Sequence, residues 1–151
     1  MQLRSATFSD LSSIQVLFVD TINNVCRFDY STEQLKVWAS VVENKNRWED
    51  AIKNDFFITA ELDGVIVGFG SLSRGNYIDF LYINSEFLRC GIANAIYKEL
   101  KNEATRIGTD KLTADVSKTA LPFFFKKGFT IQHENKRLIK GVEIINYSMS
   151  Q

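Results

Sequence analysis

The stretch from Asn76 to Leu100 constrains the fold more than any other part of the sequence. Its first part, YIDFLYI at residues 77–83, is a nearly unbroken apolar and aromatic run, which is typical of a strand buried on both faces. Its last part repeats an apolar side chain at every fourth position, at Ile92, Ile96 and Leu100, which predicts a helix with one apolar face. We therefore expect a buried strand that leads through a turn directly into a helix.

The turn between this strand and helix has the composition of an anion site. In SEFLRCGIA, residues 85–93, Arg89 supplies a cation, Gly91 lets a ligand approach the backbone, and the small Ala93 leaves room for it. The first N–H groups of a helix have no partner inside it, and the helix dipole favours a negative charge there. The turn therefore predicts phosphate binding, although its spacing is neither G-x-x-x-x-G-K-S/T nor G-x-G-x-x-G. The alternative interpretation is a helix that begins after a tight turn and binds nothing.

The length and the net charge of the chain limit the classes of protein to which it can belong. A chain of 151 residues with 45% hydrophobic and 24% charged residues suits one globular domain, residues 1–151. Lys plus Arg and Asp plus Glu number 18 each, and this zero net charge argues against a nucleic-acid partner. No apolar run approaches the ~20 residues that span a bilayer, and the N-terminal residues lack the apolar centre of a signal peptide. We expect no membrane association.

The number and spacing of the cysteine and histidine residues indicate the cellular compartment of the protein and whether it can bind a metal ion. Cys26 and Cys90 are far apart, which favours a reducing compartment over a disulfide framework, so we expect a cytoplasmic protein. One histidine and two distant cysteines have no metal-ligand spacing, so no metal is expected.

Apolar periodicity predicts a mixed α/β (α+β) fold with the order β-α-α-β-β-β-α-β-α-β-β. The capping box formed by Ser31 and Gln34 starts the second helix, and Asp63-Gly64 marks a hairpin. The strands are expected at residues 3–7, 56–62, 65–71, 76–83, 112–116, 129–134 and 142–149, the last two joined by a loop at 135–141. The helices are expected from an N-cap at Ser9 to about residue 24, from residue 31, from 92 to about 107, and at 120–126, with a further short helical piece around 47–53.

Four local patterns resemble the GNAT superfamily of acyl-CoA N-acyltransferases. Residues 88–93, LRCGIA, are similar to its pyrophosphate loop R/Q-x-x-G-x-G/A, with Leu88 in place of Arg or Gln. SKTALPFFFKKGF at residues 117–129 resembles the segment that closes over the thiol end of the cofactor. YSTEQLKVW at residues 30–38 and NYSM at 146–149 are similar to a subgroup of small bacterial members. The resemblance implies the GNAT fold, a mixed, mostly antiparallel sheet flanked by helices.

The resemblance implies acetyl-CoA as co-substrate, held where two strands splay apart at a β-bulge ending the fourth strand. The pantetheine arm would pair with the backbone of Leu81, Tyr82 and Ile83. The pyrophosphate would meet the N–H groups of Arg89, Cys90, Gly91, Ile92, Ala93 and Asn94. Ser117 and Phe124 would lie near the thiol end.

Acetyl transfer needs a neutral amine, and a carboxylate can accept its proton. Asp79 is the candidate, because a charge inside an apolar run is costly without a partner or a task. The alternative is a structural aspartate that accepts hydrogen bonds from neighbouring segments. Phe124 stands where many family members have the Tyr that protonates the leaving thiolate, and Phe has no proton to give. Of Tyr147, Tyr30 and Tyr82 we favour Tyr147 for this role, the alternative being an ordinary core tyrosine.

The first two helices and the last strands build the acceptor pocket in the family. Phe28, Tyr30, Gln34 and Trp38 are the candidate lining residues, and His133 is expected to face solvent. The sequence thus predicts an acetyl-CoA-dependent N-acetyltransferase that acts directly on a primary amine of a small molecule. The alternatives are an acyl-CoA-binding module without turnover and a protein or peptide N-acetyltransferase. The C-terminal strands could pair between two copies and form a homodimer.

Overall fold

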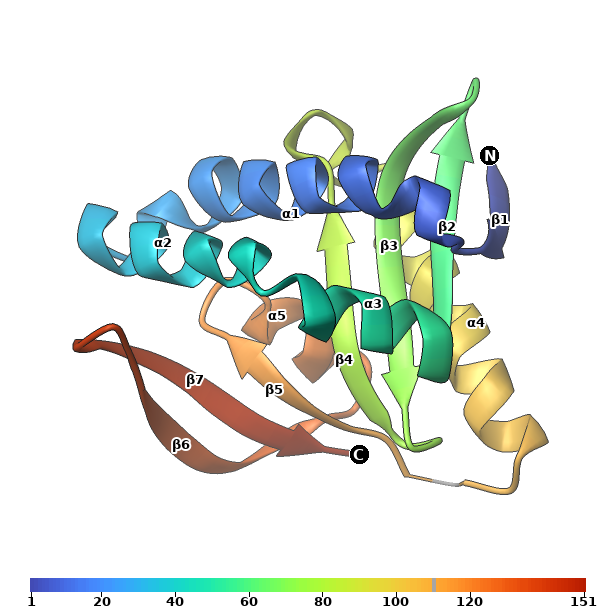
Figure 1. Cartoon of the computed structure of the whole chain (residues 1–151). Coiled ribbons are helices and arrows are strands. Elements are labelled where there is room, and N and C mark those ends of the chain that lie inside the picture. The colour runs from blue at the N-terminus through green and yellow to red at the C-terminus, as the bar shows by residue number, and fades with distance from the viewer. Residues whose placement is uncertain (110) are drawn as a thin grey trace.

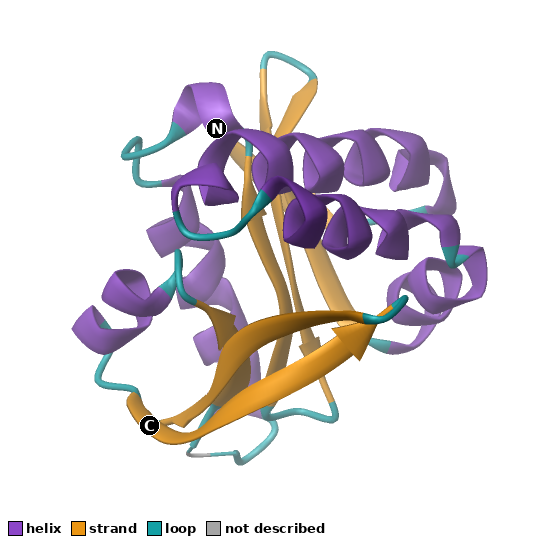
Figure 2. Ribbon diagram, turned by 90° about the vertical axis from the view of Figure 1, so that its left-hand side faces the viewer, coloured by secondary structure: helices purple, strands orange, loops and turns teal. Residues whose placement is uncertain are grey.

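The computed structural model describes residues 1–109 and 111–151, which form one seven-stranded sheet with helices on both faces (Figures 1 and 2). The sheet order is β1-β2-β3-β4-β5-β7-β6, and every neighbouring pair is antiparallel except β4–β5. The strands are β1 (Gln2–Ser5), β2 (Phe56–Leu62), β3 (Val65–Ser73), β4 (Tyr77–Ile83), β5 (Thr113–Ser117), β6 (Thr130–Ile139) and β7 (Val142–Ser150). The helices are α1 (Leu11–Val25), α2 (Thr32–Ala39), α3 (Lys45–Asn54), α4 (Ile92–Arg106) and α5 (Leu121–Lys126). Among the described residues, no helix combines the length and apolar character that crossing a membrane requires.

The predicted fold class is confirmed, and several local signals act as expected. Ser31 Oγ accepts from the Gln34 N–H at 3.1 Å, while Gln34 Oε1 accepts from the Ser31 N–H at 2.9 Å, so the capping box starts α2. Asp63 and Gly64 both have positive φ, 50° and 80°, as the tight hairpin between β2 and β3 requires. The helical piece expected around residues 47–53 is a ten-residue helix, α3, which adds a third helix before β2.

Two boundary predictions are wrong. The loop expected at residues 135–141 is a continuation of β6, and the hairpin turns at Lys140 and Gly141 instead. Polar Asn135 belongs to the strand because it is buried, and its amide donates to Asn146 Oδ1 and Ser148 Oγ, both at 2.9 Å. The N-cap of α1, expected at Ser9, is Asp10, and Ser9 lies within a 3-10 turn at Phe8–Asp10 whose own N-cap is Thr7.

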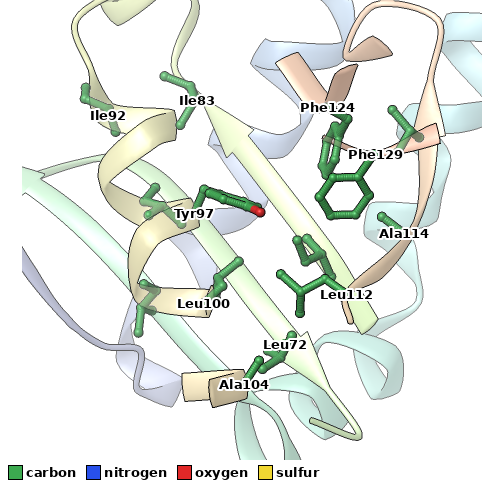
Figure 3. Close-up of a cluster of buried hydrophobic side chains, with 14 of the residues drawn as sticks. Leu72, Ile83, Ile92, Tyr97, Leu100, Ala104, Leu112, Ala114, Phe124 and Phe129 are labelled. Carbon is green, nitrogen blue, oxygen red and sulfur yellow. The ribbon is translucent and has the colours of Figure 1, made fainter. Parts of the chain in front are cut away.

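Two hydrophobic cores lie on opposite faces of the sheet. In Figure 1, α1, α2 and α3 lie in front of the strands and α4 lies behind them. The α4-side core includes Leu72, Ile78, Ile83, Ile92, Ile96, Leu100, Leu112, Ala114, Phe124 and Phe129, and Figure 3 shows how α4 meets the sheet there. The α1-side core includes Ile14, Phe18, Ile22, Trp48, Phe57, Phe69, Phe80 and Ile144. Gly70 lets α4 pack closely on β3, since a Cβ there would lie 2.5 Å from the Ile96 side chain.

An ion-pair network joins β1, β2 and the start of α1. Arg4 donates to both carboxylate oxygens of Asp10, at 2.7 and 2.8 Å, and also to Glu61. The Arg4 hydrogen bond lowers the pKa of Asp10 from 3.8 to about 2, and the Thr7 N–H contributes to the same effect. Because the folded-state pKa is depressed, this carboxylate stabilises the fold above pH ~4 and loses that contribution as the pH falls towards 2.

We expect Asp10→Asn to lower the free energy of unfolding by about 2 kcal/mol at pH 7, the value of a pKa depressed by this amount. The difference from the parent should shrink steadily below pH ~4. Urea unfolding at pH 7, 4 and 3 measures it, with Asp50→Asn, at an exposed position, as the matched control. A difference that does not change with pH would contradict this interpretation.

Candidate active site

A β-bulge in β4 places Asp79 next to an opening in the sheet. Ser71 pairs with Phe80 and Leu72 pairs with Ile78, which leaves Asp79 as one extra residue on β4 without a partner on β3. The bulge also changes which face the side chains meet, because Ile78 packs into the α4-side core and Phe80 into the α1-side core. Pairing of β4 with β5 covers only Tyr77–Thr113 and Ile78–Ala114, after which the strands diverge (Figure 1).

A cavity of about 350 Å³ lies at this divergence. One group of its lining residues belongs to the α4 face of the sheet: Ile78, Leu81, Ile83, Ala93, Ala114, Val116, Phe123 and Phe124. Another group belongs to the α1 face: Cys26, Tyr30, Trp38, Tyr82, Ile139 and Ile144. The cavity therefore has walls from both faces of the sheet, at the place where β4 and β5 separate.

The turn before α4 borders this cavity and presents backbone N–H groups. Arg89 and Gly91 are both left-handed, with φ of 61° and 81°, and Gly91 is the N-cap of α4. Gly91 is exposed, and a Cβ built on it meets no atom within 4 Å, so the space beside this backbone is open. Leu88 and Ala93, on either side, line the cavity. This is the geometry of an anion-binding nest at a helix N-terminus.

The other residues predicted for the co-substrate lie around the same cavity. Leu81, Tyr82, Ile83, Ser117 and Phe124 all line it. Cys90 of the turn and Asn94 at the start of α4 are exposed, and Ile92, the first residue of α4, is buried in the α4-side core.

Asp79 is held by Arg47, a partner that sequence reasoning missed. The Arg47 guanidinium donates to both carboxylate oxygens at 2.8 Å and lies 4.7 Å above the Phe80 ring. This hydrogen bond raises the pKa of Arg47. The Asp79 side chain is only 12% exposed, and it lines both the main cavity and a second, polar cavity that contains Arg47 and Asp55. Burial, followed by the charge of Asp79, raises the pKa of Asp55.

Asp115 on β5 is a second carboxylate in the main cavity that sequence reasoning missed. It accepts hydrogen bonds from Ser148 Oγ at 2.7 Å, Tyr77 OH at 3.0 Å, Arg137 Nη2 at 3.3 Å and Asn135 Nδ2 at 3.4 Å. These donors come from β4, β6 and β7, so Asp115 ties together the strands around the opening. The argument that selected Asp79 could also have found Asp115, because Asp115 is the single acidic residue within the strand predicted at residues 112–116.

The candidate acceptor residues separate into two groups. Tyr30 and Trp38 line the cavity, whereas Phe28 is 81% exposed and Gln34 uses its side chain for the capping box and the Glu143 carbonyl. Neither of these two, nor the exposed His133, is a lining residue.

The three candidate tyrosines differ in placement. Tyr30 OH donates to the Ile145 carbonyl at 2.7 Å and accepts from the Lys118 N–H at 3.0 Å, and burial raises the pKa of Tyr30 to about 12. Tyr82 lines the cavity, and burial raises its pKa too. Tyr147 packs against the α4-side core and is not among the residues that line the cavity.

Comparison with known proteins agrees with this architecture. Residues 26–151 match the family model of the acetyltransferase (GNAT) domain. The chain is 29% identical over 150 residues to the uncharacterized N-acetyltransferase YafP of Escherichia coli K12, a match that covers 99% of this chain and 94% of that protein. A crystal structure of a GCN5-related N-acetyltransferase from Rhodopseudomonas palustris superposes with a TM-score of 0.95 at 29% identity, covering 99% of this chain and 94% of that one.

A further structure of the same fold is the PaiA N-acetyltransferase from Thermoplasma acidophilum in complex with coenzyme A. Its TM-score is 0.83 at 17% identity, and the match covers 99% of this chain and 97% of that one. The family match covers well over half of the chain. The protein therefore belongs to the GNAT family and is an N-acetyltransferase.

Proposed function

We propose that the protein transfers the acetyl group of acetyl-CoA directly to a primary amine of a small molecule. The observation that carries this proposal is the cavity through the split sheet, with an anion-binding turn bordering its α4 side. A thioester and an amine can enter such a cavity from opposite faces and meet between β4 and β5. Direct attack then needs no acyl-enzyme, and the buried Cys26 thiol, whose pKa burial raises to about 11, is a poor nucleophile.

The residues present fit acetyl-CoA. The N–H groups of the turn from Arg89 to Asn94 would hold the pyrophosphate, in keeping with the left-handed backbone at Arg89 and Gly91. The pantetheine amides would pair with the backbone of β4 beyond Ile78, where β5 no longer pairs with it. Coenzyme A bound to the PaiA enzyme, which has the same fold, supports this assignment.

Asp79 is the proposed base. Once the amine nitrogen attacks the thioester carbonyl carbon, the C–S bond breaks, and its electron pair leaves with the coenzyme A thiolate. The proton lost from nitrogen passes to the Asp79 carboxylate, directly or through a water molecule. Arg47 fixes the orientation of that carboxylate, since a two-point guanidinium contact leaves little freedom of rotation.

A small acceptor suits the α1 side of the cavity. Trp38, Ile139 and Ile144 form an apolar wall there, and Tyr30 is fixed by its two backbone partners. Such a wall surrounds a compact ligand on several sides, as small-molecule sites do.

We expect Gly91→Ala to weaken acetyl-CoA binding by about tenfold or more, roughly 1.4 kcal/mol, while the protein stays folded. A Cβ at φ of 81° strains the turn and stands in the open space beside its N–H groups. Gly108→Ala is the matched control, because Gly108 has φ of 86°, equally open surroundings and a position beyond the C-terminal end of α4.

Titration calorimetry with acetyl-CoA and with desulfo-CoA measures both variants, and a thiol-release assay with a panel of primary amines tests turnover. Both variants should lose a similar, small amount of stability. Equal affinity in the two variants, or no binding of either ligand to the parent protein, would remove the basis of the proposed function.

A further inference from the structure

Arg137 is the one cationic side chain among the described residues that line the main cavity. It lies on β6, where it pairs with Ile144 of β7, and Ile139 lies two residues further along β6. Both isoleucines line the cavity and pack against the α1-side core. Arg137 therefore belongs to the end of the cavity from which the acceptor enters.

The anionic groups of acetyl-CoA do not account for this arginine. The proposed pyrophosphate site is the turn at residues 89–94, which borders the α4 side of the sheet. Arg137 is on the opposite side, beyond the split between β4 and β5. In the proposed binding mode, no phosphate of acetyl-CoA is available to pair with Arg137.

Asp115 uses only a small part of the hydrogen-bonding capacity of Arg137. The two side chains share one contact, Nη2 to Oδ2 at 3.3 Å, and the Arg137 side chain is 53% exposed. Asp115 already accepts shorter hydrogen bonds from Ser148 and Tyr77. A guanidinium has five N–H donors in a planar arrangement that matches a carboxylate, so most of them remain available to a ligand.

The other carboxylate of the main cavity, Asp79, is not an unpaired anion that would attract a ligand carrying only a positive charge. The Asp79 carboxylate forms an ion pair with Arg47, which lies in the second cavity and not in the main one. Asp79 and Asp115 each have an arginine partner, and of the two arginines only Arg137 faces the main cavity. A ligand with its own carboxylate would complement that cation, and the apolar wall beside it would pack against a hydrocarbon group.

We propose that the acceptor is an amino carboxylate with an apolar side chain, such as an apolar amino acid, whose carboxylate binds Arg137. This inference rests on the proposed function, because it places the amine of the same molecule near Asp79. It assigns Arg137 to acceptor specificity and Asp115 to the positioning of Arg137.

Matched pairs of amines test the inference. The rate of thiol release from acetyl-CoA is measured with L-phenylalanine against 2-phenylethylamine and with L-leucine against 3-methylbutylamine, which differ only in the carboxylate. We expect kcat/KM to favour each amino acid by about tenfold or more, mainly through KM. Arg137→Gln should abolish this preference. Lys136→Gln, which removes an exposed cation from the neighbouring position of β6, should preserve it.

A second measurement does not depend on turnover. 3-Phenylpropanoate carries the ring and the carboxylate but no amine, and its binding to the desulfo-CoA complex can be followed by the change in tryptophan fluorescence, since Trp38 lines the cavity and Trp48 does not. It should bind the parent and Lys136→Gln alike, and Arg137→Gln about tenfold more weakly. If both amines of a pair react equally well in the parent, or if 3-phenylpropanoate binds the parent and Arg137→Gln equally, the inference is overturned. Arg137-dependent binding without acetylation of any amine would instead uphold the carboxylate site and remove the proposed function.

Discussion

Asp79→Asn is expected to lower kcat by about 10²- to 10³-fold, within the range that a positioned general base contributes. The substitution preserves the shape of the side chain and one acceptor for Arg47, but an amide does not take a proton at neutral pH. The affinity for acetyl-CoA should stay within about twofold of the parent, since the proposed contacts of acetyl-CoA come from backbone groups elsewhere. Steady-state thiol release and titration calorimetry on the same preparation separate the two quantities.

Asp55→Asn is the control for this experiment. Asp55 shares the second cavity with Asp79 and Arg47 but does not line the main cavity, so its loss should leave kcat unchanged. The two variants are isosteric and remove the same charge from neighbouring positions. An Asp79→Asn enzyme that keeps half of the parental kcat would show that the proton leaves by another route.

The second large effect concerns stability. We expect Trp48→Ala to lower the free energy of unfolding by about 3–5 kcal/mol, the usual cost of truncating a buried tryptophan. Trp48 is completely buried on α3, stacks on Phe80 at 4.7 Å and meets the edge of Phe18 at 4.9 Å. Its indole N–H also donates to the Val41 carbonyl at 3.3 Å. Urea unfolding followed by circular dichroism measures the change.

The matched control is Trp38→Ala, because Trp38 is only partly buried and lines the main cavity. Its stability cost should be clearly smaller than that of Trp48→Ala. A loss below about 1 kcal/mol for Trp48→Ala would mean that α3 contributes little to the fold. The comparison also bears on catalysis, because Arg47 precedes Trp48 on α3 and reaches Asp79 only while that helix is docked.

Signals that act within a few residues were predictable from the sequence. The capping box at Ser31, the Asp63-Gly64 hairpin and the change of period after Ile83 each express a local backbone preference, and each element forms as expected. The fold class followed from their order and from the resemblance to GNAT enzymes, and both are confirmed. The individual site residues remain predictions.

What could not be predicted depends on contacts between distant segments. Arg47 and Asp79 are 32 residues apart, and nothing in either segment indicates that they meet. The segment at 135–141 looked like a loop because it is polar, yet Asn135 is buried by hydrogen bonds that β7 supplies. The face of β7 on which Tyr147 lies could not be predicted, because it depends on the register of β7 against β5.

The extra residue in β4 is Asp79, so the residue that forms the bulge is also the proposed base. A substitution at Asp79 removes the carboxylate and leaves the offset between Ile78 and Phe80, so the opening next to β5 survives. Deletion of the same residue would restore an uninterrupted strand, with Ile78 still opposite Leu72 and Phe80 still opposite Ser71. Both side chains would keep their faces, because neighbouring residues of a strand alternate, and β4 would lose the bulge that lies where it separates from β5. A substitution at Asp79 therefore tests the proposed base with the bulge in place, whereas a deletion at this position removes the proposed base and the bulge together.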